Sequence, residues 1–246
     1  MECFFPVPTK RATKKGLLIG CNYLGSARAL KGCIGDVKKM GEYYKSKGFE
    51  DLRLITDSPG ELWPPTVEGI RKGFKWLLSD LEPGDACVLH YSGHGIQHQG
   101  GLSIAPKDYL KKGFISSKEI SGYLYAIPED INVFAAFDAC HSASLVKLRY
   151  TYEDLQLHEV DVPITKSNII MISGCKDSQV SIDGRIDGEY QGAMTWAFLE
   201  SIKKTRTWHD LIFTMRKLLE IKKFSQIPQL SCGKLVDIHS NLFIFL

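Results

Sequence analysis

Short apolar runs alternate with amphipathic segments along most of the chain. Five runs rich in Val, Ile, Leu and Ala have the length and composition of buried strands. They lie at Gly16–Asn22, Leu52–Thr56, within Cys87–Gly95, within Val133–Ser142, and at Asn168–Ser173. Between them, apolar residues recur at near-helical spacing. The predicted helices are Leu30–Lys47, one that runs from an N-cap at Thr66 to about Leu81, Ser117–Tyr125, Tyr190–Lys203 and Trp208–Lys222, and one or two strands are expected between Pro228 and Leu246.

This alternation of strands and helices is typical of a parallel sheet. We therefore predict an α/β fold with a doubly wound, mostly parallel β-sheet, helices on both faces and right-handed connections. The basic, proline-containing residues 1–14 are expected to form an N-terminal arm, and residues 15–246 a single domain. Residues 145–166 are charged and lack clear periodicity, which indicates a mobile connection.

Composition and charge exclude several functional classes. The 246 residues are 44% hydrophobic and 24% charged, with a net charge of +3, which is enough apolar content for a core but implies no nucleic-acid partner. No apolar run approaches the roughly 18 residues that span a bilayer, and the N-terminus lacks a signal-peptide pattern, so no membrane partner is expected. The seven cysteines form no CxxC pair. This pattern predicts reduced thiols and a cytoplasmic location.

Two of the predicted strands break abruptly into small and polar residues. His94 follows the third strand and Cys140 the fourth. Reactive groups collect beyond the carboxyl ends of parallel strands, so neighbouring strands would bring these two side chains together. An imidazole beside a thiol can take its proton and later protonate a leaving amine, and the backbone N–H groups of Gly93 and Cys140 could stabilise an oxyanion. A lone His or Cys at a strand end is more often structural, and the residues alone leave both interpretations open.

The residues around these two side chains resemble the motifs of a known family. The motifs are Tyr91-Ser92-Gly93-His94-Gly95 and Asp138-Ala139-Cys140-His141-Ser142. They are similar to the dyad motifs of the metacaspases, which are caspase-fold cysteine peptidases of clan CD, family C14. Similar segments at 33–40, 172–179, 192–198 and 224–231 extend the resemblance over nearly the whole chain. The resemblance, closer to type I than to type II members, divides the domain into a p20-like part (15–146), a linker (147–166) and a p10-like part (167–246).

The resemblance implies a cysteine endopeptidase with His94 as general base and acid and Cys140 as nucleophile. It also implies an S1 pocket of Asp36, Ser92 and Asp138 that accepts Arg or Lys at P1 of a protein or peptide substrate. Two carboxylates are a natural counter-charge for these cations. Taken singly, Asp36 would be an acid near a helix N-terminus and Asp138 a turn residue. The family likeness further implies a monomer.

The sequence departs from the family at the expected calcium site. The loop 97–101 after His94 contains no acid, and Ser116, Ser117 and Lys118 stand where the family has paired acids. Lys147 takes the place of a further acid. Because calcium needs about six to eight oxygen ligands, several of them carboxylates, we expect no metal, no cofactor and calcium-independent activity. Ala143 replaces the family's usual glycine, which requires a negative φ at that position.

Three basic residues predict self-cleavage of the connection by an enzyme specific for Arg or Lys. These candidate sites are Lys147, Arg149 and Lys166. Specificity for Asp at P1, as in caspases, is opposed by the acids Asp36 and Asp138. The remaining alternative is a catalytically silent caspase-fold module that acts by binding or as a scaffold.

Overall fold

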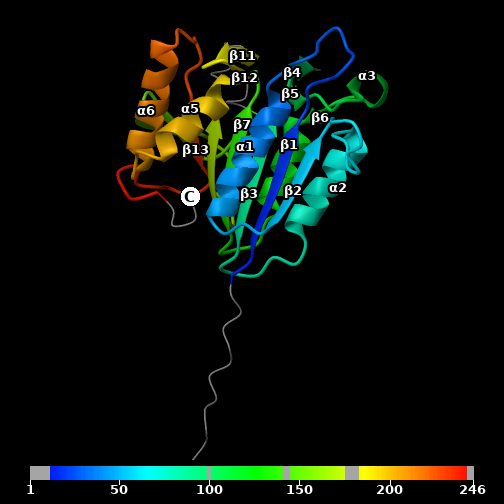
Figure 1. Cartoon of the computed structure of the whole chain (residues 1–246). Coiled ribbons are helices and arrows are strands. Elements are labelled where there is room, and N and C mark those ends of the chain that lie inside the picture. Colours follow the sequence, from blue (N-terminus) through cyan, green and yellow to red (C-terminus); the bar gives the residue numbers. More distant parts are fainter. Residues whose placement is uncertain (1–11, 99–100, 141–144, 175–182, 243–246) are drawn as a thin grey trace, which may run out of the picture.

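A computed structural model describes residues 12–98, 101–140, 145–174 and 183–242 of the chain. Within these residues, eight strands form the main sheet in the order β2-β1-β3-β7-β10-β13-β8-β9 (Figure 1). The strands are β2 (Asp51–Thr56), β1 (Lys14–Gly20), β3 (Ala86–Ser92), β7 (Asn132–Asp138), β10 (Asn168–Ser173), β13 (Gln229–Cys232), β8 (Tyr150–Glu153) and β9 (Gln156–Glu159). The first five pair in parallel, and the remaining pairings are antiparallel. The predicted α/β fold with a mostly parallel sheet is confirmed.

Helices cover both faces of this sheet (Figure 1). They are α1 (Cys33–Ser46), α2 (Val67–Leu78), α4 (Ser117–Tyr125), α5 (Ala193–Ile202) and α6 (Trp208–Ile221). The short helix α3 (Tyr109–Lys112) has no buried residue. Successive strand residues point to opposite faces. Leu18 of β1 packs in one core cluster with α1, α5 and α6, whereas Leu17 and Ile19 pack in another with α2 and α4. The strands are therefore apolar on both sides, as the continuous apolar runs predict.

Side-chain caps mark the start of three helices. Thr66 accepts a hydrogen bond from the N–H of Gly69, which confirms it as the N-cap of α2. Ser116 and Thr207 cap α4 and α6 in the same way. Each cap satisfies a backbone donor that has no partner within its helix, so the helix boundary is determined locally by a hydroxyl residue.

The segment between β7 and β10, predicted to be a mobile connection without a clear pattern, contains a β-hairpin. Strands β8 and β9 pair with each other, and β8 also pairs with β13, so the hairpin extends the main sheet. All four residues of β9 are exposed. An exposed edge strand needs no apolar face, which explains why the pattern of polar residues did not indicate a strand.

The remaining strands form two small sheets beside the main one. Strands β4 (Gly95–His98), β5 (Gly101–Ile104) and β6 (Ile115–Ser116) form the first, and β11 (Asp183–Ile186) and β12 (Glu189–Gly192) form the second. Strand β12 occupies the start of the predicted helix Tyr190–Lys203, and α5 begins only at Ala193. No helix in the described part of the chain is long and apolar enough to cross a bilayer.

Candidate active site

The two sequence stretches that carry His94 and Cys140 lie side by side in the structure. Strands β3 and β7 are parallel neighbours, with Ser92 opposite Asp138 at their carboxyl ends. The loops that follow are in close contact, because a Cβ added at Gly95 would overlap with the carbonyl oxygen of Cys140. Glycine is required at such a close approach of two backbones. The expected juxtaposition of the two segments is therefore present. It lies at the carboxyl ends of the strands, where parallel sheets bind their ligands.

The ring of His94 is held in one orientation by the backbone of the β1–α1 loop. Its Nε2 lies 2.8 Å from the carbonyl oxygen of Arg28. A carbonyl oxygen only accepts, so Nε2 carries the hydrogen and Nδ1 of the neutral ring has a free lone pair. That tautomer is the one that can accept a proton from a thiol at Nδ1. Arg28 could not be identified from the sequence, because its contribution comes from the main chain.

A second histidine, His90, lies in β3 and is excluded as a general base. Its side chain is fully buried, and neither ring nitrogen has a hydrogen-bond partner within the described residues. Burial lowers the pKa of His90 to about 3, so the ring is neutral at physiological pH. His94 and Cys140, by contrast, are each partly exposed. Of these three side chains, only those of His94 and Cys140 are accessible to a substrate.

The amide of Gly93, expected to donate to an oxyanion, is occupied in this structure. Its N–H donates to the carbonyl oxygen of Asp138 at 3.3 Å, continuing the β3–β7 ladder. This long bond would have to be released before Gly93 could bind an oxyanion. The N–H of Cys140 remains the other donor that the sequence indicates. His141 and Ala143, which follow Cys140, lie outside the described residues.

The three residues expected to form the S1 pocket come together from separate elements. Asp36 lies on α1, Ser92 ends β3 and Asp138 ends β7, and all three are buried. The hydroxyl of Ser92 donates to Oδ2 of Asp36 at 2.7 Å. The N–H of Gly192 donates to both carboxylate oxygens of Asp36 at 3.0 Å. Asp36 therefore makes contacts well beyond its own helix, which a role limited to the α1 dipole would not require.

Asp138 reaches the start of α5. Its Oδ2 accepts hydrogen bonds from the N–H and the hydroxyl of Thr195, each at 2.9 Å. Helix α5 has Gly192 at its N-cap, with no side-chain cap of its own. The carboxylate thus satisfies a free N–H in the first turn and interacts favourably with the helix dipole. Asp138 joins β7 to α5, and it is more than a turn residue.

The two carboxylates meet at Gly192. A Cβ added there would overlap with Oδ2 of Asp138 and lie 2.7 Å from Oδ2 of Asp36. Any side chain at this position would fill the space that the two acids share. Gly192 and Thr195 lie in the segment 192–198 that carries part of the family resemblance, but no role for them could be predicted. Their contacts arise only when β12 and α5 fold against the carboxyl ends of the strands.

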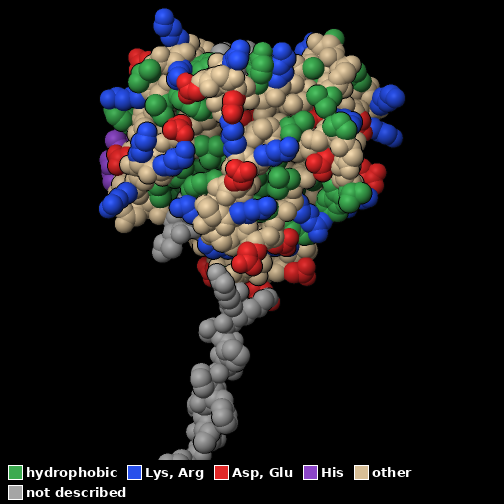
Figure 2. Space-filling model, in the orientation of Figure 1, with side chains coloured by type: hydrophobic (Ala, Val, Ile, Leu, Met, Phe, Trp, Pro, Cys, Tyr) green, Lys and Arg blue, Asp and Glu red, His purple; other side chains and the backbone are tan. Residues whose placement is uncertain are grey.

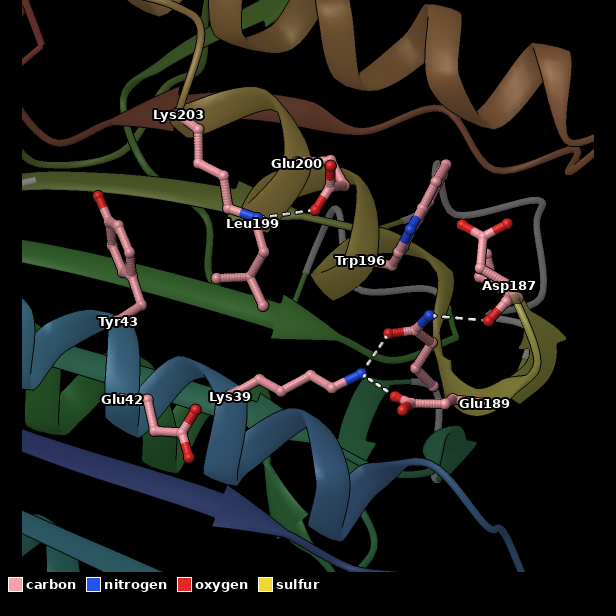
Figure 3. Close-up of a pocket in the computed structure, with 11 residues that line it drawn as sticks. Lys39, Glu42, Tyr43, Asp187, Glu189, Trp196, Leu199, Glu200 and Lys203 are labelled. Atoms are coloured by element: carbon pink, nitrogen blue, oxygen red, sulfur yellow. Dashed lines mark hydrogen bonds and ion pairs between the residues drawn. The ribbon is translucent and has the colours of Figure 1, made fainter.

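A charged contact supports Gly192 from its outer side. The ammonium of Lys39, one helical turn after Asp36 on α1, donates to Glu189 at 2.7 Å and to Oε1 of Gln191 at 2.9 Å. Figure 3 shows this contact beside a cavity of about 580 Å³ between α1, β12 and α5. The outer surface over these elements carries mixed charges (Figure 2). Lys39 therefore holds β12 against the helix that carries Asp36.

Residues considered for calcium binding have other contacts or are exposed. Ser116 caps α4, and Lys118 and Lys147 are not buried. Residues 99–100 of the loop after His94 lie outside the described part. Within that part, no group of three or more His, Cys, Asp or Glu side chains is arranged to hold a metal ion. Calcium independence stays a prediction.

Comparison with known proteins identifies the family. The profile of the metacaspase, peptidase C14 domain matches residues 14–149. Metacaspase-3 of Trypanosoma brucei brucei is 32% identical over 264 aligned residues, which cover 94% of this chain and 74% of that protein. Metacaspase-1 of Kluyveromyces lactis is 31% identical over 290, covering 91% and 67%. A crystal structure of a Geobacter sulfurreducens protein has the same fold, with a TM-score of 0.69 and 21% identity over 92% of this chain and 95% of that one. The chain belongs to the metacaspases, a family of cysteine peptidases.

Proposed function

We propose that this metacaspase is an endopeptidase that cleaves after Arg or Lys by a His94–Cys140 dyad. The thiol of Cys140 transfers its proton to Nδ1 of His94, and the sulfur attacks the scissile carbonyl carbon. Backbone N–H groups stabilise the oxyanion. The C–N bond then breaks as His94 gives its proton to the leaving amine. A water molecule, deprotonated by His94, hydrolyses the thioester and releases the second product and the free thiol.

The meeting of two buried carboxylates at Gly192 is the observation that carries the proposed specificity. Asp36 and Asp138 approach the same small residue, next to the strand end that leads into Cys140. A guanidinium or ammonium group is the side chain that two carboxylates favour, and a guanidinium can bind them through several N–H groups at once. An acidic P1 side chain would be repelled at the same place. Cleavage after Asp is therefore not expected.

Hydrolysis of two fluorogenic peptides that differ only at P1 tests this function. We expect cleavage of the P1-Arg peptide, no cleavage of the P1-Asp peptide, and loss of the activity in His94→Ala. Preferential cleavage of the P1-Asp peptide would overturn the specificity. Absence of cleavage of either peptide by a folded protein would favour a silent module that acts by binding.

Calcium is not expected to control this activity. Lys118 and Lys147 place positive charges where relatives are expected to place acids, and a hard cation needs several carboxylates. Activity on the P1-Arg peptide should be the same in calcium and in excess EGTA. A rise in activity on titration with micromolar calcium would contradict this expectation and would point to ligands elsewhere in the chain.

We further propose that the enzyme cuts its own connection after Lys147, Arg149 or Lys166, with Arg149 the slowest site. The guanidinium of Arg149 lies 2.6 Å from Glu159 and donates to the carbonyl oxygen of Val162 at 2.9 Å. A P1 side chain must leave such contacts to enter S1. Lys147 and Lys166 are exposed and have no ion pair within the described residues.

Glu159→Gln is therefore expected to speed cleavage after Arg149. The substitution keeps the shape of the side chain and removes its charge, so the guanidinium is released more often. Mass spectrometry of the incubated chain would measure the fragments, with Cys140→Ala as the control that should remain intact. If the unmodified chain and Glu159→Gln both stay intact, self-cleavage is ruled out. If cleavage after Arg149 is equally fast in both, the contact with Glu159 does not restrain this site.

The monomer implied by the family likeness is also retained as a proposal. One of the two edges of the sheet is β9, whose exposed residues include His158 and Glu159. Polar and charged side chains on an edge strand disfavour pairing with another sheet.

A further inference from the structure

Tyr23 adopts an unusual backbone conformation beside the candidate dyad. It lies in the loop after β1, and its φ of 51° falls in the left-handed region that residues with a Cβ rarely adopt. The side chain is buried. A strained residue persists only where the surrounding contacts hold it, and such residues are frequent at functional sites. The contacts that hold Tyr23 in this conformation lead to His94.

The hydroxyl of Tyr23 is bonded to the backbone of His94. It accepts the N–H of His94 at 2.8 Å and donates to the carbonyl oxygen of Ala105 at 2.7 Å. The hydroxyl of Tyr91, 3.2 Å from that of Tyr23, donates to the carbonyl oxygen of His94 at 2.9 Å. Burial raises the pKa of Tyr23 well above its ordinary value, so this phenol remains a donor. Two buried phenols thus hold both polar backbone groups of His94.

The ring of Tyr23 also contacts the imidazole directly. The two rings are stacked, with centroids 4.5 Å apart and an interplanar angle of 30°. Nε2 is bonded to the carbonyl oxygen of Arg28 at the ring's edge. The position of the imidazole is therefore determined by a stacking surface, a hydrogen bond at Nε2 and a fixed backbone. Tyr23 provides the stacking surface and, through its hydroxyl, one of the contacts that fix the backbone.

We propose that Tyr23 is a positioning residue for His94, which sets the imidazole for proton transfer with Cys140. The ring face of a tyrosine attracts a cation, so it also favours the imidazolium that forms when His94 takes the thiol proton. The hydroxyl and the ring have separable functions: one fixes the backbone of His94, and the other fixes and stabilises its side chain. This role rests on the proposed dyad and extends it by a residue that does not touch the substrate.

Two substitutions separate these functions. Tyr23→Phe keeps the stacked ring and removes the hydroxyl, whereas Tyr23→Leu removes both. We expect kcat on the P1-Arg peptide to fall about tenfold in Tyr23→Phe, because the buried N–H of His94 loses its acceptor. In Tyr23→Leu we expect a fall of about a hundredfold, the size of effect that misplacing a catalytic group produces. KM should stay the same in both, because the S1 acids are untouched.

Phe74→Leu is the matched control for loss of a buried ring. Phe74 lies on α2, is buried, and stacks on Tyr123 with centroids 4.6 Å apart. Its side chain contributes to the core and does not contact the dyad. The substitution should therefore lower thermal stability and leave kcat unchanged. An equal fall of kcat in Phe74→Leu and Tyr23→Leu would show that Tyr23 acts only through stability and would overturn the proposal.

Alkylation of Cys140 by iodoacetamide provides a readout that does not depend on peptide hydrolysis. The thiolate is the reacting form, so the rate at neutral pH reports how well His94 takes the proton. Mass spectrometry assigns the adduct to Cys140. We expect His94→Ala to be the slowest, Tyr23→Leu nearly as slow, and Tyr23→Phe to be intermediate between Tyr23→Leu and the unmodified protein.

These outcomes distinguish failure of the proposed dyad from failure of the proposed role of Tyr23. If His94→Ala slows alkylation and Tyr23→Leu does not, the dyad stands and the role of Tyr23 is overturned. If His94→Ala leaves the rate unchanged, the dyad itself fails, and the role of Tyr23 fails with it.

Discussion

Replacing Cys140 with alanine is expected to lower hydrolysis of a P1-Arg peptide by at least about 10⁴-fold, because removing the nucleophile of a catalytic unit costs as much as removing the whole unit. The fold should be unaffected, since Cys140 is partly exposed and alanine is smaller. Steady-state kinetics with the two purified proteins measures the effect, and circular dichroism checks the fold.

Cys87→Ala is the control for this substitution. Cys87 lies in β3 and is fully buried, and burial raises the pKa of its thiol to about 12, so it remains a neutral thiol that no substrate reaches. This variant should keep its activity apart from any loss of stability. Substantial activity in Cys140→Ala, or its loss in a folded Cys87→Ala, would contradict the assigned nucleophile.

Asp138→Asn is expected to reduce kcat/KM for a P1-Arg peptide by roughly thirty- to thousandfold, which corresponds to the 2–4 kcal/mol that a buried charge pair loses when one charge is removed. Asparagine keeps an oxygen that can accept from Thr195, so the start of α5 stays capped. A peptide with P1 citrulline, which has the shape of Arg without its charge, should be affected much less. The quantity to compare is the ratio of kcat/KM for the two peptides.

Asp85→Asn is the control for removing a buried carboxylate. Asp85 lies just before β3, at the opposite end of the strand from the site, and accepts hydrogen bonds from the N–H groups of Thr13 and Glu82. Its substitution should lower stability and leave the Arg-to-citrulline ratio unchanged. The S1 assignment would fail if Asp138→Asn also left this ratio unchanged.

The sheet and the placement of His94 and Cys140 could be predicted because their signals are local and strong. Buried parallel strands are continuous apolar runs, and the change to glycine, histidine and cysteine marks where each run leaves the sheet. The hairpin β8–β9 could not be predicted in this way. Its strands are short and its outer strand is exposed, so burial imposes no pattern on it.

The supporting residues of the site could not be predicted for different reasons. Arg28 acts through a carbonyl oxygen, which every residue possesses. Gly192 and Thr195 are about 55 residues away from Asp138 in the sequence. They acquire their contacts with it only when α5 packs beside β7. A tyrosine in a loop carries no signal in the sequence. Only the positive φ of Tyr23 and its stacking on His94 distinguish it.

Covalent labelling with a P1-Arg acyloxymethyl ketone peptide tests the central claim most directly. The probe must bind in S1 through its guanidinium and react with the nucleophile, so one adduct reports both. Peptide mapping should find a single adduct on Cys140, lost in Asp138→Asn and not formed by the matched P1-Asp probe. Labelling at another residue, or equal labelling by the P1-Asp probe, would contradict a Cys140 peptidase that cleaves after Arg or Lys.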